Sequence, residues 1–103
     1  MTAALIRSPE SIRDVENVVR YFMDQKTPAT AIKFGKAVMK TLNFLARFPE
    51  IGSPWESSKG RLEGVRFQNV RGFRKHLIFY RLTEVGLHVM RVFHAGQNIE
   101  KQL

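Results

Sequence analysis

The sequence predicts an α+β domain of two layers with the element order β-α-α-β-β-β and a short C-terminal tail. Between residues 9 and 47, apolar residues recur at three- and four-residue intervals, which is typical of amphipathic helices. Between residues 65 and 94, three short runs are rich in β-branched and aromatic residues, which is typical of strands. A chain of 103 residues is long enough for one modest core. We therefore expect a single domain over residues 1–103: an N-terminal strand, then an antiparallel helical hairpin packed on a three-stranded antiparallel meander.

The N-terminal region is predicted to form one strand and one helix. The short apolar stretch from Ala3 to Arg7 is expected to add a strand to the sheet. Ser8-Pro9 then signals a helix start, because a serine oxygen caps free amides and proline suits the first helical position. The helix is expected to run from Pro9 to Gln25. Its apolar face is formed by Ile12, Val15, Val18, Val19, Phe22 and Met23.

A second helix is predicted from Pro28 to about Arg47, with Thr27 as its cap. Its apolar stripe consists of Ala31, Phe34, Val38, Leu42 and Leu45. The connection between the helices is only a few residues long, so they are expected to pack in an antiparallel hairpin. Its basic residues are Lys33, Lys36, Lys40 and Arg47, and no acidic residue lies between Thr30 and Phe48. These cations indicate either a nucleic-acid face or a solvated helix surface whose lysine stems cover apolar neighbours, and the second interpretation is preferred.

The segment after the second helix is predicted to be irregular and then to enter the sheet. Proline and glycine residues interrupt the stretch from Pro49 to Gly60, and Trp55 within it is expected to anchor the loop to the core. Val65 to Val70 alternates like a strand and turns at Arg71-Gly72. Beyond His94 the chain is expected to bend and to end in at most one helical turn over residues 99–103.

The stretch from Phe73 to His94 is predicted to be a β-hairpin at the centre of the sheet. Its apolar runs flank a four-residue connection ending in Gly86, which suits a hairpin loop. Neither run alternates cleanly, so both faces of the hairpin are expected to be covered. The pairing that we expect places Leu82 opposite Leu87, Arg81 opposite His88, Ile78 opposite Arg91 and Lys75 opposite His94.

The composition limits the chemistry that the chain can perform. Seventeen Lys and Arg against nine Asp and Glu give a net charge of +8, which indicates an anionic partner such as nucleic acid, an anionic membrane or an acidic protein segment, or else serves solubility alone. The chain has no cysteine, and its three histidines have no helical i, i+4 spacing, so neither a metal nor a cofactor is expected. No apolar run approaches a membrane span, so the expected location is the cytoplasm, with no membrane partner.

The remaining candidates for function are the cations of the predicted hairpin. They are Arg74, Lys75, His76, Arg81, His88, Arg91 and His94. Such a cluster is suited to stabilise a phosphate transition state, with histidine as acid or base. It is equally suited to bind the acidic tail of a protein, or its charges reach solvent without a further role.

Four motifs follow one another along the chain: Ser8-Pro9-Glu10, the segment from Leu45 to Gly52 (LARFPEIG), the segment from Leu77 to Arg81 (LIFYR), and the segment from Arg91 to Ile99 (RVFHAGQNI). In this order they resemble the ParE branch of the ParE/RelE superfamily, the toxins of bacterial type II toxin–antitoxin modules. The resemblance covers nearly the whole chain. It implies the same strand and helix order as the residue patterns predict.

The superfamily divides by target into messenger RNA nucleases and gyrase inhibitors. RelE-like members cleave messenger RNA on the ribosome, whereas ParE-like members act on DNA gyrase. The nuclease branch commonly carries an arginine where this sequence has Leu77, and a tyrosine in a C-terminal segment where residues 97–103 have none. These departures favour the gyrase-inhibiting branch.

The resemblance implies a toxin that inhibits DNA gyrase by binding and is neutralised by a ParD-like antitoxin, with operator DNA bound only through the antitoxin. No catalytic residue is expected. The expected target-binding residues are Arg74, Arg81, Arg91, His94, Gln97 and Lys101. The alternative is a RelE-like ribosome-dependent endonuclease using Arg91 and His94 with Lys75 or Arg74, and a third hypothesis is an inactive member that only binds a partner.

Overall fold

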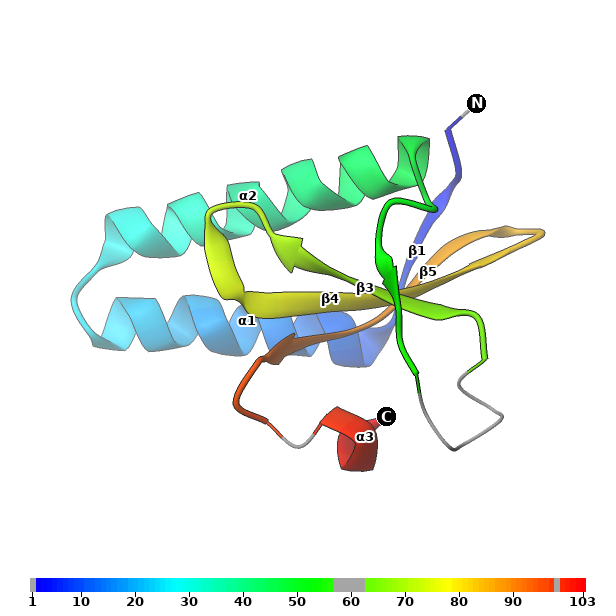
Figure 1. The fold of residues 1–103 in the computed structure, drawn as a ribbon. Coiled ribbons are helices and arrows are strands. Elements are labelled where there is room, and N and C mark those ends of the chain that lie inside the picture. The colour runs from blue at the N-terminus through cyan, green and yellow to red at the C-terminus, as the bar shows by residue number, and fades with distance from the viewer. Residues whose placement is uncertain (1, 57–62, 98) are drawn as a thin grey trace.

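The computed structural model describes residues 2–56, 63–97 and 99–103, and Figure 1 shows a helical hairpin lying on a β-sheet. The elements in chain order are β1 (Leu5–Arg7), α1 (Pro9–Asp24), α2 (Pro28–Arg47), β2 (Ser53–Pro54), β3 (Val65–Val70), β4 (Phe73–Thr83), β5 (Gly86–His94) and α3 (Ile99–Gln102). The strand order in the sheet is β1-β5-β4-β3-β2. The predicted α+β class and element order are confirmed. The two-residue strand β2, which pairs with β3, was not predicted.

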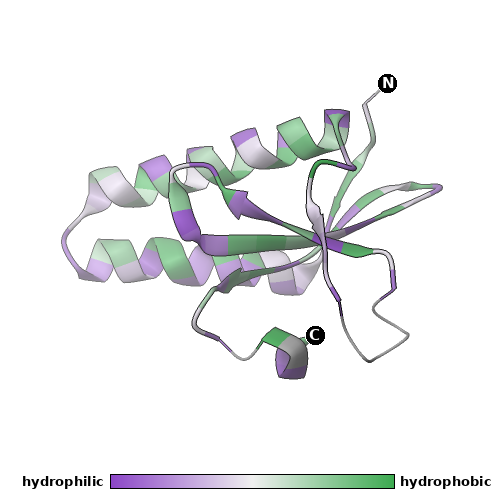
Figure 2. Cartoon of the chain, viewed as in Figure 1, coloured by the Kyte–Doolittle hydropathy of each residue, from purple (hydrophilic) through white to green (hydrophobic). Residues whose placement is uncertain are grey.

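The helical hairpin covers one face of the sheet. Hydrophobic and hydrophilic residues alternate along both helices, and hydrophobic residues fill the middle of β4 (Figure 2). The buried side chains of α2 meet Ile78 and Tyr80 of β4 and Val89 and Val92 of β5 in one cluster. The aromatic ring of Phe34 stands edge-on to that of Phe73, with ring centroids 5.0 Å apart. This cluster is the main core of the domain.

The two helix starts differ in how they are capped. Ser8 Oγ accepts a hydrogen bond from the Ser11 amide at 3.0 Å, so the predicted serine cap of α1 is confirmed. Thr27 occupies the cap position of α2, but its side chain makes no capping bond. Its hydroxyl donates instead to the Phe22 carbonyl at 2.7 Å, because the tight connection places the end of α1 within its reach. The predicted position of Thr27 as the cap residue is therefore confirmed, but its side chain does not make the capping hydrogen bond.

The other face of the sheet is covered by the loop around Trp55 and by the C-terminal tail. A second cluster combines the buried residues Val65, Phe79, Phe93 and Ile99 with the partly buried Trp55, Phe67, Leu77, Met90 and Leu103. The Trp55 ring stands edge-on to Phe79 at 5.3 Å, which confirms its role as an anchor. Both faces of the central hairpin are therefore covered, as its non-alternating sequence predicted.

The hairpin register contains an irregularity that the sequence did not predict. Leu82 faces Leu87 and Arg81 faces His88, as expected, but the register shifts between Phe79 and Tyr80. Beyond this bulge His76 faces His94, and Ile78 faces Val92. The expected pairs of Ile78 with Arg91 and Lys75 with His94 were wrong, because an extra residue enters one strand at a bulge and displaces all later pairs.

The first strand, β1, forms one edge of the sheet and pairs with the last strand, β5. β1 runs parallel to β5, with Leu5 beside Leu87 and Arg7 beside Val89. At the start of β5, Gly86 has φ +150°, and a Cβ there would lie 2.5 Å from the Ala4 carbonyl oxygen. Only glycine fits this approach of the two strands. Within the described residues, no helix is long and apolar enough to cross a membrane.

Candidate functional site

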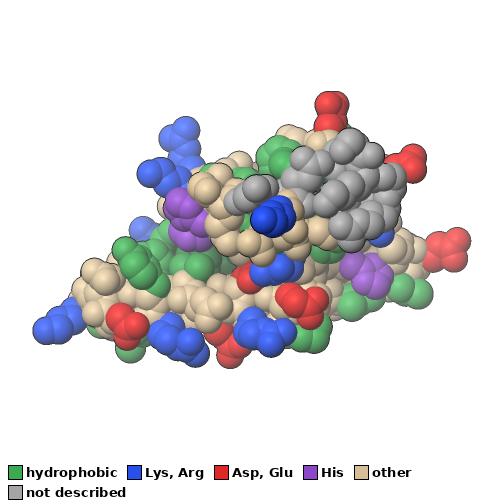
Figure 3. Space-filling model, turned by 90° about the horizontal axis from the view of Figure 1, so that it is seen from below, with side chains coloured by type: hydrophobic (Ala, Val, Ile, Leu, Met, Phe, Trp, Pro, Cys, Tyr) green, Lys and Arg blue, Asp and Glu red, His purple; other side chains and the backbone are tan. Residues whose placement is uncertain are grey.

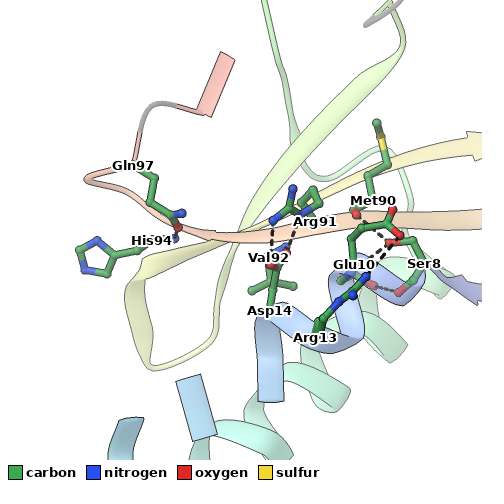
Figure 4. A network of polar contacts seen from close by, with 10 residues as sticks. Ser8, Glu10, Arg13, Asp14, Met90, Arg91, Val92, His94 and Gln97 are labelled. Carbon is green, nitrogen blue, oxygen red and sulfur yellow. Dashed lines mark hydrogen bonds and ion pairs between the residues drawn. The ribbon is translucent and has the colours of Figure 1, made fainter. Parts of the chain in front are cut away.

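Arg91, one of the predicted target-binding residues, is held in an ion pair with Asp14 of α1 (Figure 4). The guanidinium Nε and Nη2 donate to the two carboxylate oxygens at 2.8 and 2.9 Å. Asp14 Oδ2 also accepts the Val92 amide at 2.9 Å. Such a two-pronged pair fixes the plane of the guanidinium. It therefore ties α1 to the middle of β5 and occupies one edge of the arginine.

The surroundings of Arg91 stabilise its protonated, positively charged form. The hydrogen bonds that Arg91 donates to Asp14 raise the pKa of Arg91 above its ordinary value, while partial burial acts in the opposite direction. The guanidinium carbon also lies 4.5 Å from the centroid of the Phe93 ring, within the range of a cation–π contact. The side chain of Arg91 is 25% exposed and that of Asp14 is 13% exposed. A partner molecule therefore reaches only a part of this cation.

His94 and Gln97 form a compact turn at the end of β5. The His94 amide donates to Gln97 Oε1 at 2.7 Å, and the Gln97 amide donates back to the His94 carbonyl at 3.0 Å. The Gly96 amide donates to His94 Nδ1 at 3.2 Å. This leaves the imidazole exposed at the tip of the sheet, as Figure 4 shows. Of the predicted site residues, these two are in direct contact.

His76 joins this end of the sheet from β4. Its ring lies edge-on to that of His94, with centroids 5.3 Å apart, and it packs against Phe34. Its Nδ1 is buried and has no hydrogen-bond partner among the described residues. Burial, and secondly the nearby charge of His94, lower the pKa of His76 below its ordinary value. The imidazole pair was not predicted, because it depends on the bulge.

The other predicted residues are spread over the sheet. Arg74 and Lys75 are exposed near the His94 end, where the Ala95 amide donates to the Lys75 carbonyl at 2.7 Å. Arg81 faces His88 near the opposite end of the hairpin, five residues from His76, which is about 17 Å along a strand. Lys101 is exposed on α3. The structure therefore brings together His94, Gln97 and Lys75, and it places Arg81 apart from them.

Leu77 occupies the place where an arginine is common in the nuclease branch. It faces Phe93 across the hairpin and packs against the second cluster. The tail residues Ile99 and Leu103 pack on the same cluster. This region of the sheet is thus filled by apolar side chains from β4, β5 and α3. Within the described residues, no group of three or more His, Cys, Asp or Glu is placed to hold a metal ion.

Two features of the structure were not predicted from the sequence: the partner of Arg91 and the surroundings of the cations on α2. Asp14 was not identified as a site residue from the sequence, because its partner Arg91 lies 77 positions away in the chain. For the cations of α2, a solvated helix surface was preferred over a nucleic-acid face. The structure places Lys40 of α2 beside Arg71 and Gly72 of the turn between β3 and β4, and together they line a hollow of about 800 Å³. The absence of acidic residues in α2 was the signal that pointed to it.

The chain was compared with protein families, curated proteins and solved structures. Residues 5–99 match the family model described as "ParE toxin of type II toxin-antitoxin system, parDE". No curated protein matches the chain. A solved structure titled "Chromosomal ParDE TA system from P. aeruginosa" superposes with a TM-score of 0.73 at 14% identity, covering 90% of this chain and 96% of that chain. At this identity the likeness supports the fold alone, whereas the family match spans nearly the whole sequence. The chain belongs to the ParE toxin family of type II toxin–antitoxin systems.

Proposed function

We propose that this chain is a toxin that inhibits DNA gyrase by binding it, that it catalyses no reaction itself, and that a ParD-like antitoxin neutralises it. Membership of the ParE family supports the toxin role. Within this proposal, operator DNA is recognised by the antitoxin, and the complex acts in the cytoplasm. The expected target contacts are Arg74, Arg81, Arg91, His94, Gln97 and Lys101.

The observation that carries the proposal is the two-pronged pair of Arg91 with Asp14. A nuclease must neutralise the charge that develops on the phosphate in the transition state. Preorganised cations aimed at that charge supply most of this stabilisation. Arg91 directs its guanidinium at a carboxylate of its own chain. Leu77 and the tail fill the neighbouring region with apolar side chains. The arrangement therefore favours a binding protein over a nuclease.

Two assays with the purified chain test the proposal. We expect DNA gyrase to lose supercoiling activity when the chain reaches a stoichiometric ratio to the enzyme, and we expect addition of the cognate antitoxin to restore it. We expect messenger RNA in a translating extract to stay intact under the same conditions. Cleavage phased with codons in the ribosomal A site, without an effect on gyrase, would establish the RelE-like alternative. Inactivity in both assays would instead identify an inactive member that only binds a partner.

A matched pair of variants locates the contact surface. We expect His94→Ala to weaken inhibition of gyrase, because the imidazole is exposed at the tip of the sheet. Arg20→Ala on α1 serves as the control, since this side chain is exposed and donates a hydrogen bond to Asn17 of the same helix. Equal inhibition by both variants would place the contact surface elsewhere on the chain.

A further inference from the structure

The strongest unassigned feature is a groove between α2 and the turn that joins β3 to β4. Its larger hollow, of about 800 Å³, and a smaller one of about 440 Å³ share Lys40 and Arg71, so the two form one depression. We call it the basic groove, after its six cations: Lys33, Lys36, Lys40, Arg71, Arg74 and Lys75. All six side chains are exposed to solvent.

The charge of the basic groove is of one sign. No acidic residue is among the described residues that line either hollow. The ion pairs found in the described part of the chain, Glu10 with Arg13 and Asp14 with Arg91, lie elsewhere. By contrast, acidic and basic side chains are interspersed over the face that Figure 3 shows. Half a dozen uncompensated cations around a concave surface create a strongly positive local potential.

The geometry of the groove suits a linear polyanion. Lys33, Lys36 and Lys40 follow one face of α2 over about 10 Å, at 1.5 Å per residue. Arg71, Arg74 and Lys75 stand on the side formed by the turn and β4. A backbone that carries a charge on every unit can therefore contact cations on both sides of the groove at once.

The lining of the groove favours nucleic acid over an acidic protein helix. An amphipathic helix requires a row of apolar anchor pockets at helical spacing. The larger hollow instead presents the side-chain amide of Gln68, which is a hydrogen-bonding partner for phosphate and sugar oxygens, while the Asn69 amide donates to the Arg74 carbonyl. The exposed large apolar side chains among the described lining residues are Phe44 in the larger hollow, 42% exposed, and Ile32 in the smaller one, 60% exposed, which are too few to form such a row. Phe44 is suited to stack on a base.

We propose that the basic groove binds the phosphate backbone of nucleic acid directly and without sequence preference. This activity is separate from the proposed inhibition of gyrase and from operator recognition by an antitoxin. It would add a contact of the toxin's own wherever its target or its operator already holds DNA.

Binding of the full chain to a fluorescent 20-base-pair duplex, and to one of its single strands, tests this proposal over a range of salt concentrations. With about six phosphate contacts, the logarithm of the duplex binding constant should fall with the logarithm of salt concentration at a slope near −5. The double variant Lys40→Gln with Arg71→Gln should bind about tenfold more weakly or worse, and its slope should be shallower by about two.

The matched control removes the same charge from α1. Arg13→Gln with Arg20→Gln has the same net charge as the groove variant, and both side chains are exposed. We expect the control to bind within about twofold of the natural chain, since its cations lie outside the groove. Equal losses in the two double variants would overturn the proposal, because they would show attraction by net charge alone.

Two further outcomes decide the chemical class of the partner. Failure of the natural chain to bind either nucleic acid at low salt would overturn the proposal. Binding of a polyglutamate peptide, lost in the groove variant and not displaced by nucleic acid, would assign the groove to an acidic protein instead. Urea unfolding of both double variants checks that their folds are intact, and a second groove pair, Lys36→Gln with Arg74→Gln, replaces the first if it is unstable.

Discussion

The hydroxyl of Tyr80 fixes the entry of the chain into β2. Tyr80 is fully buried. Its hydroxyl donates to the Pro49 carbonyl at 2.7 Å and accepts the Gly52 amide at 3.0 Å. A Cβ at Gly52 would lie 2.3 Å from the same oxygen, so the loop and the ring are fitted to one another.

We predict that Tyr80→Phe lowers the free energy of unfolding by about 1–3 kcal/mol, because it leaves a buried amide without a partner. Urea unfolding followed by circular dichroism measures the change. Tyr21→Phe is the matched control, since Tyr21 is 58% exposed, and it should change stability by less than about 0.5 kcal/mol. Equal effects from the two substitutions would contradict this account of Tyr80.

Asp14 and Arg91 are expected to contribute to stability as a unit. We predict that Asp14→Asn and Arg91→Gln each lower the free energy of unfolding by about 2 kcal/mol, since each leaves a partly buried charge without its counterion. The double variant should be less destabilised than the sum of the two, by about 1 kcal/mol or more. Additive losses in urea unfolding would show that the pair makes no specific contribution.

The same variants separate the two roles of Arg91. Arg91 is predicted to contact the target, and the structure also gives it a partner within the chain. If it contacts the target, Arg91→Gln should weaken gyrase inhibition more than Asp14→Asn at equal stability. If its role is to hold α1 on β5, the two variants should lose inhibition together.

Among the elements, the β4–β5 hairpin shows how far the sequence determines the sheet. Composition and the glycine loop predicted the strands and the pairs nearest the loop, Arg81 with His88 and Leu82 with Leu87. The bulge at Phe79 and Tyr80 was not predicted, because no glycine or proline marks it in the sequence. Its effect is to bring His76 opposite His94.

We predict that the domain loses stability on acidification through His76. Its pKa in the folded chain is lowered from 6.5, chiefly by burial. The unfolded chain therefore takes up the proton first, so the free energy of unfolding is highest above pH 6.5 and falls as the pH drops through 6.5 to the folded pKa. Urea unfolding between pH 5 and 8 measures this slope. His76→Phe should flatten it, whereas His88→Phe, at the other end of the hairpin, should retain it.

The C-terminal helix α3 is predicted to support the fold as well as the function. Ile99 is 8% exposed and packs against Phe79 and Phe93. We expect Ile99→Ala to lower the free energy of unfolding by about 2–3 kcal/mol, because it leaves a cavity in the second cluster. Gln97→Ala, at an exposed position, should cost about 1 kcal/mol or less.

These two variants sharpen the interpretation of any truncation of the tail. Deletion of residues 97–103 removes two of the predicted target contacts, Gln97 and Lys101, and also part of the second cluster, so a loss of toxicity would have two explanations. Weakened growth arrest by Gln97→Ala at normal stability would support a contact role for the tail. Weakened growth arrest by Ile99→Ala alone would support a structural one.

At the scale of the whole molecule, the net charge of +8 is expected to steer the antitoxin. Attraction between this surface and an acidic antitoxin segment accelerates encounter, and salt screens it. We predict that the association rate constant falls about tenfold or more between 50 and 500 mM salt, while the dissociation rate constant changes less. Stopped-flow mixing measures both. A salt effect confined to dissociation would contradict steering.

The sequence predicted the fold of the whole molecule better than its functional surface. Helix periodicity, the Ser8 cap and the anchor Trp55 are local signals, and each was confirmed. The pair of Asp14 with Arg91 and the basic groove join residues that are distant in the chain. Arg71-Gly72 predicted the turn between β3 and β4, but the approach of this turn to α2 and the docking of α1 on β5 are tertiary contacts, which no local pattern specifies. The assignment of the target contacts stays a prediction.

The pairing of β1 with β5 has a consequence for the synthesis of this protein. Ser8 donates through its hydroxyl to the Met90 carbonyl at 2.7 Å, 82 positions away, and through its amide to the Val89 carbonyl at 3.0 Å. β1 can therefore pair only after β5 has been synthesised, because the chain between them must close into a loop before these contacts form. A nascent chain that stops before β5 leaves β1 unpaired and the central strand β4 open at one edge. The sheet thus reaches its native strand order only after β5 has left the ribosome.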